Sequence, residues 1–167
     1  MTYKKSFLIL GLALLVQPVL SSMIGYFGAV DPYMVLGLMA LLMLKKENAI
    51  PMVVACLTIG FCKDQLTSIY PGVYLLALTI VFILGAYVKE RLNTDNKFLL
   101  MLIIIIATWL MKTIMWAGYS FLGCPYGYGF VIPYLLKYEI ANLIFAVLSY
   151  VLLSYINKKN SRLKYYR

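Results

Sequence analysis

The sequence has no histidine, only six acidic residues and only three cysteines among 167 residues. Without histidine there is no imidazole to activate a nucleophile or to ligate a metal ion. The cysteines, Cys56, Cys62 and Cys124, form no C-x-x-C pair, so neither a zinc knuckle nor a redox dithiol is indicated. In apolar surroundings they are expected to be buried thiols. The sequence therefore predicts no metal and no other cofactor.

Charged residues are also scarce, at 13% of the chain, whereas 63% of the residues are apolar. A soluble domain usually contains about 45 to 50% apolar residues, and 15 basic and six acidic side chains could not cover so large a soluble core. A membrane-spanning helix takes about 20 apolar residues, so this length holds about six spans with short loops. The sequence predicts an all-α fold, a polytopic integral membrane helix bundle that forms a single transmembrane domain over residues 1–167.

Six apolar stretches are expected to cross the bilayer. Their approximate ranges are 7–27, 31–44, 49–66, 71–88, 98–121 and 133–156, followed by a basic cytoplasmic tail at 157–167. The first stretch resembles a cleaved signal peptide, but Val19-Leu20-Ser21-Ser22 is a poor cleavage site, which favours a retained span. The second stretch is short, since 13 apolar residues cover only about 20 Å. It either begins nearer Ala29, with lysines reaching the interface, or forms half of a re-entrant pair.

The basic residues predict the orientation of the bundle. With a cytoplasmic N-terminus and six spans, the inner segments contain twelve of the 15 basic residues, so both termini are expected inside. These charges separate apolar runs and do not form a patch interleaved with exposed aromatics, so a nucleic-acid partner is not expected. The inner segments are expected to contact anionic lipid or a filament protein. Their basic residues are Lys4, Lys5, Lys45, Lys46, Lys89, Arg91, Lys97, Lys158, Lys159, Arg162, Lys164 and Arg167.

The remaining ionisable residues lie at membrane depth, where a charge is costly and usually faces protein or water. Lys112 is about 14 Å below the outer end of its span, and Glu139 is about 9 Å below the outer end of the next. The sequence therefore predicts a buried Lys112–Glu139 ion pair, with Lys112 reaching the outer interface as the alternative. Asn142, one turn further, is expected to add a helix–helix hydrogen bond. The others are Asp31, Lys63, Asp64 and Lys137.

Catalysis by these carboxylates is not expected. Intramembrane aspartyl proteases need two facing acids that share a proton. Asp64 has no second aspartate in a paired motif and adjoins Lys63, and Glu139 follows Lys137 by two residues. The neighbouring lysines would keep both carboxylates ionised, so the sequence predicts that the chain is not an enzyme.

Several short motifs carry a family resemblance over about residues 7–156. Gln17 precedes a proline in the first span, and Asp31-Pro32 breaks the chain before a short apolar helix. The block Gly60-Phe61-Cys62-Lys63-Asp64 leads to Pro71-Gly72 and the next span, and Glu139-Ile140-Ala141-Asn142-Leu143 lies in the last span. Together these motifs resemble the family of the rod-shape-determining membrane protein MreD, although the charges of Lys63 and Lys112 are additional to its pattern.

The resemblance implies a non-enzymatic, multi-pass component of the bacterial cell-elongation machinery in the bacterial cytoplasmic membrane. Such a protein binds the single-span protein MreC and helps to couple MreB filaments inside the cell to wall synthases and peptidoglycan synthesis. The candidate partner-binding or structural polar-core residues are Asp64, Lys112, Glu139, Asn142 and Gln17. Small residues would permit close helix approach, either to a partner or in internal packing: Gly11, Ala13, Gly37 and Ala40.

The same layout is also similar to the substrate-binding subunits of energy-coupling-factor vitamin transporters, which look related in fold, so fold alone does not decide between the two. In that alternative, Trp109, Trp116, Lys112 and Glu139 would line an outer cavity for a small molecule. These transporter subunits dock their energising partner through an Ala-x-x-x-Ala pattern in the first span. Here that span offers only Gly11-x-Ala13, which favours the elongation component.

Overall fold

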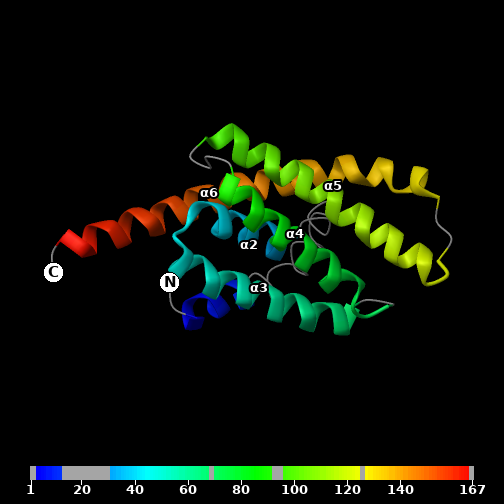
Figure 1. Ribbon diagram of the computed structural model, residues 1–167, viewed down its shortest axis with the longest axis horizontal. Coiled ribbons are helices and arrows are strands. Elements are labelled where there is room, and N and C mark those ends of the chain that lie inside the picture. The colour runs from blue at the N-terminus through cyan, green and yellow to red at the C-terminus, as the bar shows by residue number, and fades with distance from the viewer. Residues whose placement is uncertain (1–2, 13–30, 68–69, 92–95, 125–126, 166–167) are drawn as a thin grey trace.

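A computed structural model of the chain describes residues 3–12, 31–67, 70–91, 96–124 and 127–165. All regular structure in these ranges is helical, which confirms the all-α prediction (Figure 1). An N-terminal helix over 3–12 is followed by four α-helices, one short 3₁₀-helix and a last long α-helix. Their bounds are α2 Pro32–Met43, α3 Lys46–Thr67, α4 Val73–Arg91, α5 Lys97–Phe121, η2 Tyr128–Phe130 and α6 Ile132–Tyr165.

Three of the described helices are long and apolar enough to cross a membrane. They are α4, α5 and the Tyr138–Ile156 part of α6. α2 is equally apolar but has only 12 residues, about 18 Å of helix. The composition of these helices supports the prediction of a membrane protein.

The ends of the helices follow from local sequence. α2 begins at Pro32, where the missing N–H costs nothing because the first turn of a helix has unpaired N–H groups in any case. The Asn96 side chain caps α5 by accepting a hydrogen bond from the Phe98 N–H at 3.0 Å. Gly72, before α4, and Gly123, after α5, have φ values of +104° and +96°, a backbone conformation that side chains with a Cβ rarely adopt.

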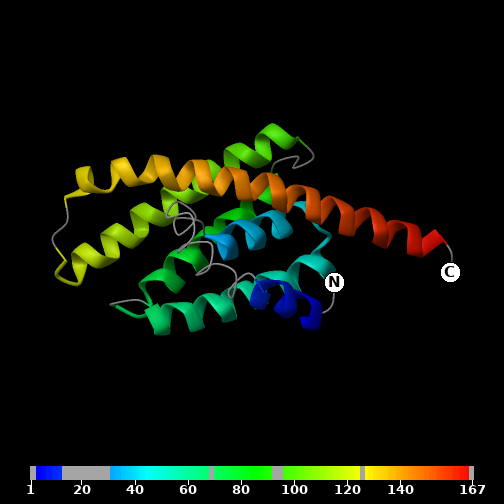
Figure 2. The same cartoon turned by 180° about the vertical axis from the view of Figure 1, so that it is seen from behind.

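Two predicted segments differ from the structure or lie outside it. The predicted tail is helical, because α6 continues without a break to Tyr165, and Figures 1 and 2 show this end extending beyond the other helices. The first predicted span covers residues 7–27, and the structure describes only its first six residues, 7–12, which belong to the helix over 3–12. The remainder, including Gln17 and Ala13, lies outside the described residues.

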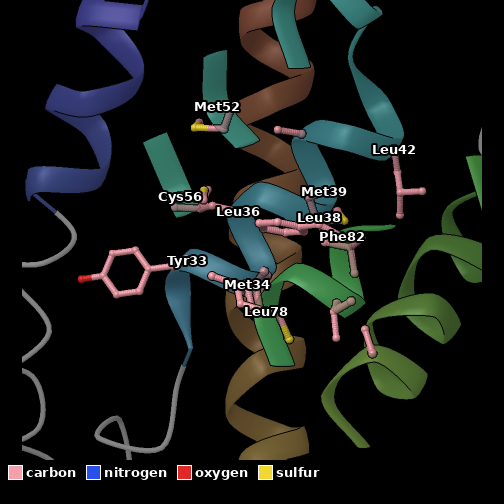
Figure 3. Close-up of a cluster of buried hydrophobic side chains, with 14 of the residues drawn as sticks. Tyr33, Met34, Leu36, Leu38, Met39, Leu42, Met52, Cys56, Leu78 and Phe82 are labelled. Atoms are coloured by element: carbon pink, nitrogen blue, oxygen red, sulfur yellow. The ribbon is translucent and has the colours of Figure 1, made fainter. Parts of the chain in front are cut away.

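The short helix α2 lies at the centre of the bundle. Its neighbours are α3, α4, α5 and α6 (Figures 1 and 2). Ten of its 12 residues are buried, and Figure 3 shows Met52 and Cys56 of α3 and Leu78 and Phe82 of α4 beside its side chains. A helix that is apolar on every face avoids water, either inside a protein core or in lipid, and the central position of α2 provides the first of these.

Two glycines allow α2 and α4 to approach closely. A Cβ at Gly37 of α2 would collide with the ring of Phe82 and lie 2.9 Å from Cys56 Sγ. A Cβ at Gly85 of α4 would collide with Leu38 of α2. Gly37 therefore serves internal packing, one of the two roles that the sequence left open for it. Gly11 has nothing within 4 Å of a Cβ position.

Candidate functional site: polar groups inside the bundle

A cluster of polar residues lies at the N-terminal end of α2. We call it the Asp31 cluster and define it as Asp31, Lys63, Tyr74, Thr108 and Asn142. Asp31 immediately precedes α2, and the other members come from α3, α4, α5 and α6 in that order. The N-cap residue of α2 and one residue from each of the other four helices thus bring polar groups to the same place in the bundle.

The carboxylate of Asp31 is the acceptor in this cluster. The Tyr74 hydroxyl donates a hydrogen bond to Asp31 Oδ1 at 2.5 Å, and Lys63 Nζ lies 3.9 Å from the same oxygen. The Lys63 ammonium also lies over two aromatic rings, 4.7 Å from the centroid of Tyr74 and 5.3 Å from that of Tyr33. A buried charge needs such partners because burial removes its hydration. Asp31 is 4% exposed, so its negative charge is balanced inside the bundle.

The Asn142 side chain links the start of α2 to α5 and α6. Its Oδ1 accepts a hydrogen bond from the Asp31 N–H at 3.0 Å, and its Nδ2 donates to Thr108 Oγ1 at 3.2 Å. The Thr108 hydroxyl in turn donates to the Ile104 carbonyl at 2.9 Å. The helix–helix hydrogen bond predicted for Asn142 is therefore present, and Asn142 also holds the backbone at the beginning of α2, which the sequence did not reveal.

Asp64 connects the end of α3 to the beginning of α4. Its Oδ2 accepts hydrogen bonds from the backbone N–H groups of Gly72 at 2.6 Å and Leu75 at 3.2 Å. The first N–H groups of a helix have no partner within the helix, and a carboxylate satisfies them and complements the helix dipole. Asp64 is fully buried, and its two hydrogen bonds cap the beginning of α4.

The predicted Lys112–Glu139 ion pair is wrong. The Lys112 ammonium lies over the ring of Tyr138, 4.0 Å from its centroid, and both Glu139 carboxylate oxygens are buried without a hydrogen-bond partner. Adjacent helical residues point about 100° apart around the axis. Because Tyr138 faces Lys112 on α5, Glu139 faces elsewhere. Position along a helix does not determine which way a side chain points, because that depends on the rotation of the helix about its axis.

Aromatic residues gather near the connection between α5 and α6. The rings of Trp116 and Tyr128 meet edge to face with centroids 5.0 Å apart, and the Tyr128 and Thr113 hydroxyls are 3.0 Å apart. Tyrosine and tryptophan favour the water–lipid boundary. Trp109, a predicted cavity-lining residue, is 40% exposed, and so lies at the surface of the described bundle.

Lys89 was assigned only to an inner loop by the sequence, but it has a specific partner. Its ammonium donates hydrogen bonds to the backbone carbonyls of Leu41 and Leu44, the second at 2.6 Å, at the C-terminal end of α2. A cation is favourable at this end of a helix, where carbonyls lack partners and the dipole is negative. The separation of 48 residues between Lys89 and Leu41 left no local signal for this contact.

The described residues include no group of three or more His, Cys, Asp or Glu side chains placed to hold a metal ion. The fold and these contacts define a helical bundle with a polar cluster inside an apolar core and with helices able to cross a membrane. Compared with protein-family models, with curated proteins and with solved structures, the chain has no match.

Proposed function

We propose that the chain is a non-enzymatic, multi-pass component of the cell-elongation machinery in the bacterial cytoplasmic membrane. In this role it binds a single-span, MreC-like protein and helps to couple MreB filaments inside the cell to the wall synthases. The MreD-like motifs motivate the proposal. Asp31, Asp64 and Asn142, which belong to these motifs, all make hydrogen bonds that join helices or helix ends.

The observation that carries the proposal is that the polar side chains of the Asp31 cluster contact one another inside the bundle. The Asp31 cluster satisfies its charges and hydrogen bonds within the bundle, and so serves to hold five helices together. What the long helices leave exposed is mainly apolar, and such surfaces contact lipid or other membrane helices. On α6 the exposed large apolar residues are Ile132, Leu136, Ile140, Ile144, Val147, Leu148, Val151, Leu152 and Tyr155.

Few residues separate successive helices in the part of the chain from α2 onward. Two residues separate α2 from α3, and five separate α4 from α5. A protein of this form interacts through its helix faces and helix ends. Small residues and specific polar contacts then drive helix association, since apolar side chains alone gain little by leaving lipid.

The second candidate is a vitamin-binding transporter subunit, and Glu139 is the observation that favours it. A buried carboxylate without a partner would suit a cationic group of a small ligand. Against it, Trp109 is at the surface, and Lys112 and Glu139 do not face one another. These residues therefore do not form the common cavity wall that this candidate requires.

Affinity purification of the full-length, tagged chain from its host membranes in a mild detergent tests the two candidates. We expect a single-span protein with an extracytoplasmic coiled coil to be retained in near-stoichiometric amount. An unrelated multi-pass protein with the same tag is the matched control and should not retain it. A vitamin or vitamin precursor bound to the purified chain, with no single-span protein, would refute the elongation role.

A further inference from the structure

The Lys112 ammonium on α5 lacks an anionic partner in the described part of the chain. Its neighbour is the ring of Tyr138, whose centroid is 4.0 Å away, and no described carboxylate lies within that distance. The Asp31 carboxylate pairs with Lys63, and Glu139 faces elsewhere. Burial removes water from the Lys112 ammonium, so its charge is costly unless an anion compensates it.

Lys112 lies between the buried and the exposed faces of α5. It is about 40° around the helix axis from Thr108, which is 1% exposed, and about 60° from Trp109, which is 40% exposed. Lys112 itself is partly exposed. Molecules outside the bundle can therefore reach this side chain, whereas the carboxylate oxygens of Glu139 are enclosed.

The neighbouring aromatic residues indicate how deep Lys112 lies in a bilayer. Trp116, one turn further along α5, meets Tyr128 of η2 edge to face, and tryptophan and tyrosine favour the level of the lipid headgroups. From Lys97, the first residue of α5, to Trp116 the helix rises about 28 Å, close to the thickness of a hydrocarbon core, about 30 Å. Lys112 lies about 6 Å inside the level of Trp116, and a long lysine side chain can extend from there to the headgroups.

We propose that Lys112 binds the phosphate group of a phospholipid in the leaflet at the α5–α6 connection. Phosphate is the anion that a bilayer holds at this level, and its oxygens accept hydrogen bonds from an ammonium. The positive charge favours an anionic lipid such as phosphatidylglycerol over zwitterionic phosphatidylcholine. Inward from Lys112, the lipid chains would lie against exposed apolar residues of the same helix, Trp109, Ile106 and Leu102. This inference does not depend on the elongation role.

Fluorescence quenching by brominated lipids tests the site in the full-length protein. Trp109→Phe leaves Trp116, one turn from Lys112, as the one tryptophan of the chain. The protein is reconstituted in mixtures of phosphatidylcholine and phosphatidylglycerol, with the bromine first on one lipid and then on the other. We expect phosphatidylglycerol to associate near Trp116 about fivefold more strongly than phosphatidylcholine, the preference that one lysine near the membrane surface confers.

Matched variants assign this preference to Lys112. Lys112→Met removes the charge with little change in side-chain length and should abolish the preference, whereas Lys112→Arg keeps the charge and should retain it. Lys46→Met, which removes an exposed lysine at the beginning of α3, should also retain it. Equal association of the two lipids with the protein that keeps Lys112 would overturn the proposal, as would a preference that persists in Lys112→Met.

A soluble anion is the other source of a phosphate group, and inorganic phosphate is the probe for it. Equilibrium dialysis of the protein in phosphatidylcholine vesicles against radiolabelled phosphate measures this binding. We expect no difference between the wild-type protein and Lys112→Met. Phosphate binding that Lys112→Met abolishes, without a preference between the two lipids, would overturn the lipid site and indicate a site for a soluble anion.

Discussion

At the scale of single residues, three polar side chains of the bundle have a definable structural task. Asn142 holds the start of α2, Asp64 caps α4, and Lys89 caps the end of α2. Each side chain satisfies backbone groups that a helix end leaves unpaired. The net effect is that polar residues fix where the helices begin and end, while apolar residues fill the space between them.

Asn142→Leu should destabilise the bundle. It removes the acceptor of the Asp31 N–H and the donor to Thr108, and leaves a buried backbone N–H unpaired, which costs about 1–3 kcal/mol. The free energy of unfolding, measured by titrating the protein from mild detergent into dodecyl sulfate, should fall by this amount. Ile144→Leu, at an exposed position on α6, is the control and should leave stability unchanged. Equal stability of both variants would contradict the linking role of Asn142.

Lys89→Met should also destabilise the protein, because it removes the charged donor to the Leu41 and Leu44 carbonyls at the end of α2. Hydrogen bonds to charged groups contribute about 1.5–3 kcal/mol, and partial exposure of Lys89 places the expected loss at the lower end. The same unfolding titration measures it. Lys45→Met changes an exposed lysine in the α2–α3 connection and should have little effect. If the free energy of unfolding falls equally in both variants, the positive charge of this region stabilises the protein and the hydrogen bonds of Lys89 to the end of α2 do not.

At the scale of elements, α2 determines the arrangement of the others. It is too short to cross a bilayer as a straight helix and has only apolar residues, and it is enclosed by α3, α4, α5 and α6. Its two ends carry the polar contacts, the Asp31 cluster at one end and Lys89 at the other. We therefore regard α2 as the core around which the longer helices pack.

Gly37→Leu should disrupt this core. The larger side chain would be forced into the ring of Phe82 and the thiol of Cys56, and overpacking of this kind costs about 1–3 kcal/mol or more. The unfolding titration and the yield of monodisperse protein report the loss, and Phe82→Ala in the same chain should restore part of it. Gly11→Leu is the control, because a Cβ there meets nothing within 4 Å. Full stability of Gly37→Leu would contradict the close approach of α2 and α4.

Sequence reasoning predicted the helices well and the contacts between them poorly. Apolar runs and breakers such as Pro32 and Gly72 identify helices, because their effects are local. The rotation of a helix about its own axis depends on packing, so reasoning from positions along the helices alone led to the wrong Lys112–Glu139 pair. The contact of Lys89 with α2 joins residues far apart in the chain, and no local pattern could reveal it.

At the scale of the whole molecule, the proposed role requires the bundle to have one defined orientation in the membrane. The basic residues predict that both termini and the α4–α5 connection lie inside and that the α5–α6 connection lies outside. On a chain whose native cysteines are replaced by alanine, Gly129→Cys should react with an impermeant maleimide in intact cells. Glu90→Cys should react only after the cells are opened. Reaction of both positions in intact cells, or of neither, would contradict this orientation.

The proposed role requires this helical bundle to hold a single-span protein partner. Native mass spectrometry of the full-length protein, released directly from its host membranes, tests the claim most directly. We expect a complex whose added mass is that of one single-span protein. A bare chain, or a chain whose added mass is that of a vitamin-sized molecule, would contradict the account.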